Sequence, residues 1–333
     1  MKDPDQELVA TIRNQLKLVK KVLVISHQRP DGDAIGSLLA MGLPLLAAGK
    51  DVQMVLKDRI PDNFRFLVGS EFVQTKPKGK VDYIIVVDSA EVERTDTDFS
   101  EYGVPDLNID HHKTNTYFAK INLVERDAVA TAEILTRYFP DFGFHISKPV
   151  ADALLTGIVT DTIGFRTTNV NPQVLRMVAD LMEMGGDLTD IYYRTIVEQS
   201  LAAARYWGAG LSKIQMDDGL VWTTLSLRER HAAGYLARDD ADLVKILSAI
   251  EGAEVAVILT EQDTGYVKIS WRLCGSLATE IDVSDIAQHF GGGGHKAAAG
   301  ADVIGNLGEL LVKVLAETKK SMNHVKDTIK EIR

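Results

Sequence analysis

The stretch VLVISHQRPDGDAIGS, residues 22 to 37, joins an apolar run to a cluster of polar side chains. VLVIS has the composition of a buried strand, and the apolar pattern over residues 34–49 predicts a helix directly after it. Between the two, His27, Asp31 and Asp33 surround a Pro-Asp-Gly turn. A strand that runs into a helix in this way predicts the first unit of a parallel α/β sheet.

The same alternation of short apolar strands and helices continues through the first half of the chain. Strands separated by helices imply parallel pairing, with helices packed on the sheet. We therefore predict an α/β fold with a doubly wound parallel sheet in this half. The predicted strands are residues 21–26, 51–57, 81–90 and 105–112, and the predicted helices are residues 130–139, 149–161 and 171–185.

The second half of the chain predicts a smaller α/β domain. All nine prolines lie at or before Pro172, so the composition changes near this point. We predict a first domain over residues 1–186, a helical connector over residues 187–213 and a second domain over residues 214–333. In the second domain, strands are expected at residues 220–227, 253–262 and 266–273, and helices at residues 241–250 and 306–325.

The bulk composition is that of an ordinary soluble globular protein. The 333 residues are 45% hydrophobic and 25% charged, and the longest apolar stretches are too short to span a bilayer. A single cysteine, Cys274, excludes an internal disulfide framework, and the N-terminus has no signal-peptide pattern. We therefore expect a cytoplasmic protein that does not bind membranes. The net charge of −10 disfavours capture of long duplex DNA or RNA but is compatible with a small anionic substrate, because bound cations can invert the charge of a local site.

Acidic and imidazole side chains also follow the later strands of the first domain. Asp88 closes the run IIVVD, and Asp110, His111 and His112 close LNIDHH. Asp161 ends an apolar helical run in GIVTDTIGF. In a doubly wound sheet, ligands bind outside the carboxyl ends of the strands. We therefore expect these side chains to meet those of the first turn at one edge of the sheet.

Each of these residues has a purely structural alternative when it is taken singly. Asp33 could cap the helix that follows it, and Asp88 and Asp161 could each cap a helix or a turn. Adjacent side chains on an extended strand point to opposite faces, so His111 and His112 would need separate partners. Four clusters at the ends of strands and helices are harder to explain by capping alone, and together they favour a binding site.

The donor types restrict the metal that this site would bind. Aspartates with a minority of imidazoles and no thiolate suit Mn²⁺, with Mg²⁺ or Co²⁺ as substitutes, better than a structural zinc ion. The candidate ligands exceed in number what one tetrahedral ion needs. A pair of ions about 3.5–4 Å apart, bridged by one carboxylate and a hydroxide, fits this number better and is suited to phosphoryl transfer.

The order and spacing of these motifs resemble those of the DHH phosphoesterases. The likeness runs from about Lys21 to Arg166, and the motif set is highly specific. FGGGGHKAAAG, residues 290–300, is similar to the signature of the DHHA1 domain, which extends the resemblance over nearly the whole chain. Within the family, the short two-domain enzymes of the nanoRNase and pAp-phosphatase type are the most similar. The four motifs of the first domain are HxxxDxD at 27–33, VVD at 86–88, DHH at 110–112 and TD at 160–161.

The resemblance implies a metal centre with two Mn²⁺ ions and a shared ligand. Asp88 would bridge the ions, and a hydroxide between them would attack the phosphate. His112 would hydrogen-bond the scissile phosphate, and Asp110 would orient its neighbours. Arg94 and Arg166 follow two of the metal motifs and could contact phosphate, although solvated surface arginines are an equal alternative. The implied ligands are His27, Asp31 and Asp88 for one ion and Asp33, Asp88, His111 and Asp161 for the other.

A run of four glycines followed by basic residues marks the second domain. Glycines permit positive φ and close approach of backbone N–H groups to an anion, although a glycine run alone is more often a hinge. The planar fork of an arginine on a nearby predicted strand suits phosphate. By resemblance, the substrate end away from the cleaved bond binds here, and a cleft between the two domains would clamp a short molecule. The residues concerned are Arg272, Gly291, Gly292, Gly293, Gly294 and His295.

These features together predict a phosphoesterase for very short nucleic acids. The expected substrates are single-stranded RNA or DNA oligonucleotides, linear dinucleotides such as pApA, and pAp, which would yield AMP. The alternatives are a RecJ-like single-strand exonuclease, an inorganic pyrophosphatase, a membrane-type cyclic-dinucleotide phosphodiesterase and a catalytically silent nucleotide sensor. The GGGGH motif counts against a pyrophosphatase, and the intact ligand set counts against a sensor. The sequence leaves a homodimer open.

Overall fold

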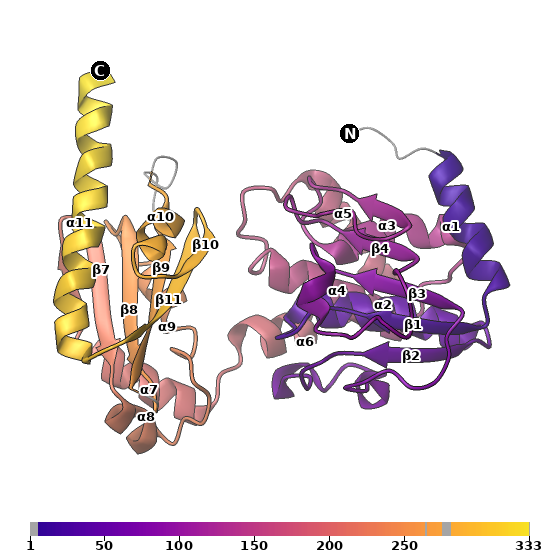
Figure 1. Ribbon diagram of the computed structural model, residues 1–333, viewed down its shortest axis with the longest axis horizontal. Coiled ribbons are helices and arrows are strands. Elements are labelled where there is room, and N and C mark those ends of the chain that lie inside the picture. The colour runs from indigo at the N-terminus through magenta and orange to yellow at the C-terminus, as the bar shows by residue number, and fades with distance from the viewer. Residues whose placement is uncertain (1–5, 264, 275–280, 333) are drawn as a thin grey trace. The chain divides into compact units, whose positions relative to one another are not determined.

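The chain folds into two compact units, Met1–Glu198 and Gln199–Arg333, and each has its own sheet and hydrophobic core. Figure 1 shows the computed structural model. Among the helices of the described residues, none combines the length and the apolar character needed to cross a bilayer. The structure describes residues 6–263, 265–274 and 281–332, and the side chains of His295 and of residues 327–332 lie outside this description.

The first unit is built on a five-stranded sheet in which all neighbouring strands run parallel. The strands are β1 (Lys21–Ile25), β2 (Asp51–Val55), β3 (Tyr83–Val87), β4 (Leu107–Asp110) and β5 (Ile121–Val124). Their order in the sheet is β2-β1-β3-β4-β5, so the chain steps to one side after β1 and to the other side from β3 onward. The predicted parallel α/β sheet is confirmed.

The strand β5 is absent from the sequence prediction. It has only four residues, forms one edge of the sheet, and buries Leu123 alone. A half-exposed edge strand lacks the continuous apolar run that marks the central strands, so its sequence resembles that of a loop.

Helices cover one face of this sheet, and loop residues close the other. Val22 and Val24 of β1 belong to the main core with the helices. The alternate residues Leu23 and Ile25 face a smaller cluster that includes the loop residue Phe99, because successive strand side chains point to opposite faces. The helices are α1 (Gln6–Leu18), α2 (Gly32–Ala47), α3 (Thr131–Phe142), α4 (Lys148–Asp161), α5 (Pro172–Glu183) and α6 (Leu188–Tyr192), with short turns at η1 (Asp62–Phe64), η2 (Ser70–Phe72), η3 (Val92–Thr95) and η4 (Tyr193–Val197).

Glycines let α2 and α4 pack at close range. A Cβ on Gly36 would lie 2.4 Å from the backbone O of Ala153 and 2.9 Å from the backbone N of Gly157. A Cβ on Gly157 would lie 2.5 Å from Oδ1 of Asp33. The contact therefore brings the first turn of α2, which carries Asp33, against the end of α4, which finishes at Asp161.

The second unit contains a six-stranded mixed sheet in the order β10-β11-β9-β8-β7-β6. Its elements are α7 (Leu201–Leu211), β6 (Gln215–Asp217), β7 (Leu220–Leu225), α8 (Leu227–Ala233), α9 (Leu243–Leu247), β8 (Val255–Glu261), β9 (Tyr266–Leu273), α10 (Val283–Gln288), β10 (Gly293–His295), β11 (Ala298–Ile304) and α11 (Leu307–Ile332). Alternate residues of β8 enter two cores: Val257 packs with residues of α10 and α11, and Ile258 packs with residues of α7 to α9. The predicted smaller α/β domain is confirmed.

Two local features of this unit differ from what the sequence suggests. Gly293 and Gly294 belong to a strand and not to a hinge, because they form β10, which pairs with β11 as an antiparallel hairpin. The helix expected over residues 241–250 is reduced to α9, because Ala241 and Asp242 have positive φ values of 53° and 62° and interrupt the pattern. Glycine is depleted in strands, so a glycine-built strand gives no sequence signal.

Replacing Gly36 by alanine tests the close packing of α2 on α4. The added Cβ meets backbone atoms that cannot rotate away, so Gly36→Ala should lower the free energy of unfolding by about 1–3 kcal/mol. The control is Gly208→Ala in α7, where a Cβ meets nothing within 4 Å, and where better helix propensity should stabilise by about 0.5–1 kcal/mol. Thermal and urea unfolding of both variants measure the difference. Equal stability of the two variants would show that the helices are not held in contact by glycine.

Candidate metal centre

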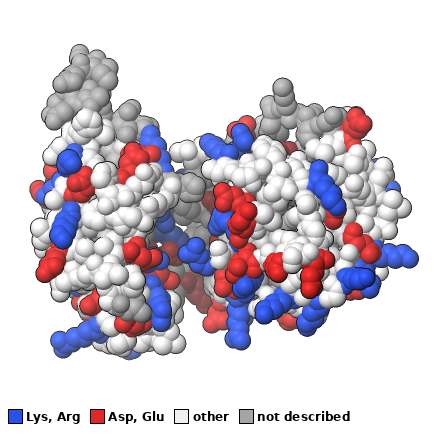
Figure 2. Space-filling view, in the orientation of Figure 1, with Lys and Arg blue, Asp and Glu red and all other residues white. Residues whose placement is uncertain are grey.

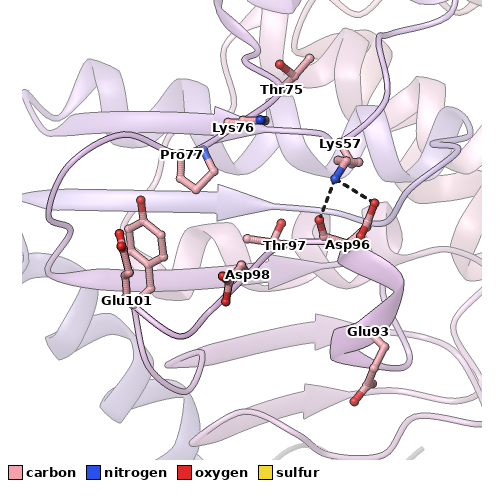
Figure 3. A pocket seen from close by; sticks show the side chains of 10 residues that line it. Lys57, Thr75, Lys76, Pro77, Glu93, Asp96, Thr97, Asp98 and Glu101 are labelled. Atoms are coloured by element: carbon pink, nitrogen blue, oxygen red, sulfur yellow. Dashed lines mark hydrogen bonds and ion pairs between the residues drawn. The ribbon is translucent and has the colours of Figure 1, made fainter.

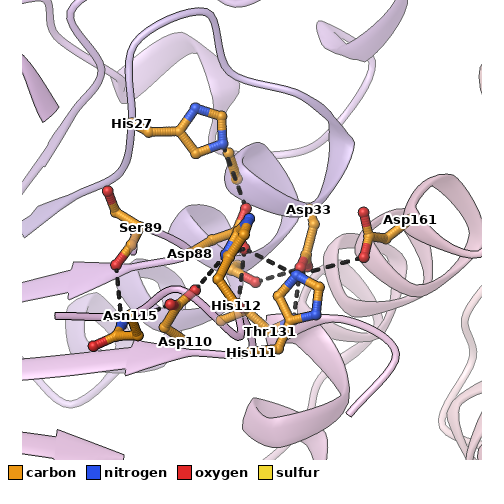
Figure 4. A network of polar contacts seen from close by, with 12 residues as sticks. His27, Asp33, Asp88, Ser89, Asp110, His111, His112, Asn115, Thr131 and Asp161 are labelled. Atoms are coloured by element: carbon orange, nitrogen blue, oxygen red, sulfur yellow. Dashed lines mark hydrogen bonds and ion pairs between the residues drawn. The ribbon is translucent and has the colours of Figure 1, made fainter. Parts of the chain in front are cut away.

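The carboxyl ends of β1, β3 and β4 bring the predicted motifs to one edge of the sheet. His27 lies just beyond β1, Asp88 follows β3, and Asp110 ends β4. The strand order reverses between β1 and β3, and a crevice forms at such a switch point because the chain leaves the two strands in opposite directions. The helix α2 adds Asp33, and α4 adds Asp161. Figure 4 shows these side chains converging.

Asp88 lies at the centre of the cluster, with only 1% of its surface exposed. Its Oδ2 is 3.5 Å from Nε2 of His27, and its Oδ1 is 3.7 Å from Nε2 of His111. The hydroxyl of Thr131 donates to the same Oδ1 at 2.9 Å. The backbone φ of Asp88 is 54°, a left-handed conformation that is uncommon for a residue with a Cβ and that clusters at functional sites. One carboxylate thus faces imidazoles from two strands, as a bridging ligand requires.

Backbone carbonyls orient the two imidazoles that face Asp88. Nδ1 of His27 donates to the O of Gln28 at 2.8 Å, and Nδ1 of His111 donates to the O of Ala128 at 3.3 Å. In both rings Nδ1 is thus occupied by a backbone carbonyl, and Nε2 is the nitrogen that faces Asp88 and could bind a metal ion. A second hydrogen bond of this kind is how proteins orient imidazole ligands.

Asp31 and Asp33 also make structural hydrogen bonds. Oδ1 of Asp31 caps α2 by accepting from the N–H groups of Asp33 and Ala34, each at 3.1 Å. Asp33 does not cap α2: its two oxygens accept from the N–H groups of Thr131 and Ala132 at 2.6 and 3.0 Å. These donors lie at the N-terminus of α3, where a carboxylate is stabilised by the helix dipole. Within the described residues, Oδ2 of Asp31 accepts no hydrogen bond and Oδ2 of Asp33 accepts one, so each carboxylate keeps lone pairs for a metal ion.

Burial and neighbouring negative charge raise the pKa of two carboxylates in this cluster, whereas neighbouring imidazoles lower the pKa of the third. Burial raises the pKa of Asp33 well above its ordinary value, and the charges of Asp88 and Asp161 add to the effect. Burial also raises the pKa of Asp161 to about 6, with an opposing contribution from His111. For Asp88, burial is outweighed by the hydrogen bond from His27 and by the other imidazoles, which lower its pKa. The concentrated negative charge fits a divalent cation, which would favour the ionised form of every carboxylate.

Within the described residues, the candidate ligands fall into three groups. In each group, one donor atom from every member lies within 4.8 Å of the donor atoms of the other members. Carboxylates and imidazoles without thiolate suit a hard or borderline divalent ion. The structure thus brings together every side chain that the resemblance implied as a ligand. The groups are His27 with Asp31 and Asp88, Asp33 with His111 and Asp161, and Asp88 with His111 and His112.

The two histidines of the DHH motif do not point to opposite faces, and that expectation is wrong. Their ring centroids lie 4.6 Å apart, because β4 ends at Asp110 and the alternation of an extended strand does not reach His111 and His112. The two rings differ instead in their hydrogen-bond partners. Nδ1 of His111 donates to the backbone carbonyl of Ala128, whereas Nδ1 of His112 lies 2.7 Å from Oδ1 of Asp110. Burial acts to lower the pKa of His112, but the hydrogen bond to Asp110 and the charge of Asp88 outweigh it and raise the pKa to about 9.

Sequence reasoning missed the buried side chains that hold this cluster in place. Nδ2 of Asn115 donates to Oδ2 of Asp110 at 2.6 Å and to Oδ1 of Asn108 at 2.8 Å. Asp110 is thereby fixed between Asn115 and His112. Thr131 joins two candidate ligands, one through its N–H and one through its hydroxyl. Of these residues, only Thr131 has a signal in the sequence, because it lies at the start of a predicted helix.

The two arginines predicted near phosphate have different surroundings. Arg94 is half-buried in η3, and its positive charge opposes the rise in the pKa of His112. The carbonyl of Arg94 accepts from the N–H of Gln28 at 2.7 Å, which connects η3 with the loop after β1. Arg166 is exposed beyond α4, and its N–H donates to the carbonyl of Thr162. These contacts place Arg94 beside the DHH motif.

The predicted substrate residues of the second unit lie on the β10–β11 hairpin and the neighbouring β9. Arg272 is half-buried on β9, in register with Ala298 of β11. Ala298 is in turn in register with His295 of β10. The hairpin therefore brings the backbones of Arg272 and His295 to the same end of the sheet, while the side chain of His295 lies outside the described residues.

Packing explains only some of the glycines in this run. A Cβ on Gly292 would lie 2.2 Å from the O of Gly300, and a Cβ on Gly294 would lie 2.5 Å from the O of Ala298. Gly293 is exposed, has no positive φ, and has open space where a Cβ would lie. Neither the backbone conformation nor the packing of the described residues accounts for a glycine at position 293.

A hollow of about 710 Å³ lies beside the loops that follow β2 and β3 (Figure 3). Its lining contains four carboxylates and two lysines, of which Lys57 pairs with Asp96 at 2.9 Å. None of its lining residues is a candidate metal ligand. Carboxylates that hold no metal ion would repel a phosphate, and the carboxylates of this hollow are not candidate metal ligands. The candidate site for a phosphate substrate is therefore the metal cluster and not this hollow.

A parallel sheet with aspartates and histidines at its switch point, followed by a mixed-sheet unit, is an α/β architecture with a candidate site for divalent metal ions. Residues 21–158 match the DHH family, N-terminal domain, and residues 234–321 match the DHHA1 domain. The chain is 32% identical over 326 residues to the bifunctional oligoribonuclease and PAP phosphatase of Thermus thermophilus, and 95% of each protein is covered. The chain belongs to the DHH family, as its motifs predicted, and is a hydrolytic phosphoesterase.

Two further relatives differ in how much of the chain they match. The crystal structure of an exopolyphosphatase-related protein from Bacteroides fragilis has a TM-score of 0.88 and 25% identity, with 99% of each chain covered. A probable manganese-dependent inorganic pyrophosphatase of Bacillus mycoides is 29% identical over 182 residues, which is 52% of this chain and 58% of that protein. The likeness to the pyrophosphatase thus extends over about half of the chain.

Mn²⁺ should stabilise the protein through Asp88. A ligand that binds only the folded state at 100 times its Kd adds about 2.7 kcal/mol to the free energy of unfolding, so Mn²⁺ should raise the melting temperature of the chelator-treated protein. Asp88→Asn should abolish most of this shift, because the central carboxylate is lost. Asp96→Asn is the control, since Asp96 is an exposed carboxylate paired with Lys57. A Mn²⁺ shift of wild-type size in Asp88→Asn would contradict the central role of Asp88.

Proposed function

We propose that the chain is a Mn²⁺-dependent phosphoesterase that hydrolyses short oligonucleotides, linear dinucleotides such as pApA, and pAp to AMP. The observation that carries the proposal is the convergence of aspartates and histidines around the buried carboxylate of Asp88. The oligonucleotide and pAp substrates are suggested by the relative from Thermus thermophilus, which is similar over 95% of both chains. The buried free thiol of Cys274, the one cysteine, suits a cytoplasmic location.

In this proposal two ions share the carboxylate of Asp88. One ion would be held with His27 and Asp31, and the other with Asp33, His111 and Asp161, groups whose donor atoms lie within 4.8 Å of one another. Bound divalent ions would supply an acidified water and neutralise charge on the phosphate. The protein's own contribution is orientation: the N-terminus of α3 and the carbonyls of Gln28 and Ala128 fix the ligands before substrate arrives.

His112 is assigned to the scissile phosphate and not to a metal ion. Its Nδ1 hydrogen-bonds Asp110, whereas Nδ1 of His111 bonds a backbone carbonyl. Asp110 is itself held by Asn115, so the ring of His112 is fixed from behind and its Nε2 is the remaining donor. A positioned donor of this kind stabilises the charge that develops on a phosphoryl oxygen.

The second unit is assigned to the substrate end away from the cleaved bond. Arg272 offers a planar fork for phosphate, and Gly293, Gly294 and His295 are assigned to the same substrate end. The N–H groups of Gly291 and Gly292 donate instead to the carbonyls of Gln288 and Ala287, so these two glycines would contribute the shape of the turn and not donors. The unexplained glycine at position 293 supports this assignment, because an exposed backbone without a Cβ can be approached closely by a ligand.

A second candidate function, hydrolysis of pyrophosphate, is favoured by the likeness to the Bacillus mycoides protein over about half of the chain. Processive cleavage of long strands is less favoured, because such enzymes track the strand with a positively charged groove. On the faces of the two units shown in Figure 2, Lys and Arg are interspersed with Asp and Glu, and the net charge of the chain is −10.

Product release from five substrates tests the proposal directly. With Mn²⁺ present, pAp, pApA and a five-nucleotide RNA should be hydrolysed, whereas a long single strand and pyrophosphate should not. Asp88→Asn should abolish turnover of all substrates. Processive degradation of the long strand would identify an exonuclease, and turnover of pyrophosphate alone would identify a pyrophosphatase. Binding of metal and pApA without any product would identify a sensor.

Gly293→Ala tests the substrate assignment of the hairpin without disturbing its packing. The melting temperature should not change, because a Cβ at this position meets nothing within 4 Å. The KM for pAp should rise about tenfold with little change in kcat, as expected when a contact to an anion is lost. Gly294→Ala, with a φ of 149° and a Cβ 2.5 Å from Ala298 O, should instead lower the melting temperature. An unchanged KM in Gly293→Ala would remove the glycine run from substrate binding.

A further inference from the structure

Tyr117 is an aromatic side chain that the fold leaves half exposed, five residues beyond the second histidine of the DHH motif. Its φ is 55°, a left-handed conformation that is costly for a bulky residue. The conformation is held from both sides, because the N–H of Tyr117 donates to Oδ1 of Asn115 at 2.7 Å and its carbonyl accepts from Nδ2 of Asn122 at 3.4 Å. Tyr117 is therefore a fixed aromatic surface on a strained backbone.

The guanidinium of Arg126 completes this surface. Its Cζ lies 5.7 Å from the centroid of the Tyr117 ring, within the range of a cation–π contact. Arg126 is exposed in the loop after β5, and no carboxylate of the described residues forms an ion pair with it. The pair combines a flat π surface with an uncompensated positive charge, which are the two features that single-stranded nucleic-acid sites use.

Both members of the pair are attached to residues that hold the DHH side chains. Asn115, two residues before Tyr117, donates to Oδ2 of Asp110 at 2.6 Å. Ala128, two residues after Arg126, accepts from Nδ1 of His111 at 3.3 Å. Because two residues span at most about 7 Å, the pair lies near the metal cluster, at the edge of the sheet where β4 and β5 end.

We propose that Tyr117 and Arg126 form a stacking platform for a nucleobase of the substrate, next to the phosphate that is cleaved. This platform rests on the proposed function. It would let the protein distinguish a nucleotide, which carries a base, from an inorganic phosphate, which does not. Every base has a π face, so such a platform accepts all four bases and gives little sequence preference. The ring supplies the stacking surface, and Arg126 attracts the substrate anion.

The decisive comparison uses pApA and the same dinucleotide with both bases replaced by tetrahydrofuran abasic sites. Tyr117→Asn removes the ring but tolerates the left-handed backbone, so the loop should keep its conformation. The KM for pApA should rise about tenfold, with little change in kcat, whereas the KM for the abasic dinucleotide should not rise. Tyr117→Phe should restore the preference for pApA, because the ring is retained.

Equilibrium binding of both dinucleotides without Mn²⁺ accompanies the kinetics, with Tyr193→Asn as the matched control for loss of an exposed tyrosine. Equal weakening of both dinucleotides by Tyr117→Asn would reduce Tyr117 to a structural role and overturn the platform. If the wild-type protein hydrolyses neither dinucleotide and also fails on pAp and the five-nucleotide RNA, the proposed function fails, and the ratio of the two Kd values still decides the platform. If Tyr193→Asn also lost the preference for pApA over the abasic dinucleotide, this would count against the platform, because the loss would not be specific to Tyr117.

Discussion

The candidate metal centre depends on holding three carboxylates close together, those of the buried Asp33 and Asp88 and of the partly buried Asp161. Two unit charges 4 Å apart repel by about 4 kcal/mol at an effective dielectric constant near 20, so the fold must offset this repulsion. It does so with fixed donors: the N-terminus of α3 donates two N–H groups to Asp33, and Thr131 and two imidazoles surround Asp88. The charge that remains is what a divalent cation would neutralise. Metal affinity is therefore partly relief of a repulsion that the fold itself creates.

Close packing and backbone conformation both constrain the spacing of these carboxylates. A Cβ on Gly157 would lie 2.5 Å from the carboxylate of Asp33, so any side chain there would displace a candidate ligand. Asp88 and Ile163, the latter two residues after Asp161, both have positive φ, at 54° and 51°. For a β-branched residue this conformation is strained, and strain persists only where the surrounding structure determines it. Close packing and strain thus coincide at the same edge of the sheet, where the site is built.

The sequence predicts where strands end more reliably than what happens after they end. The apolar run before Asp88 and the run before Asp110 each locate a strand, and parallel pairing then brings their ends together. Beyond Asp110 the alternation stops, so the shared orientation of the two histidines and the support from Asn115 depend on contacts that no period encodes. The β10–β11 hairpin was missed for a related reason, because Gly293 and its neighbours are poor strand formers that pair only through the register with β11.

In the proposed mechanism the metal ligands would determine which bond is attacked, but they would not read a base. In this chain the loops after β4 and β5 hold Asp110 and His111, and the same loops carry Tyr117 and Arg126. A base stacked on this pair would stabilise the loops that orient the DHH side chains, so binding energy from a non-reacting part of the substrate would help to position the phosphate. An inorganic phosphate, which has no base, gains none of this coupling.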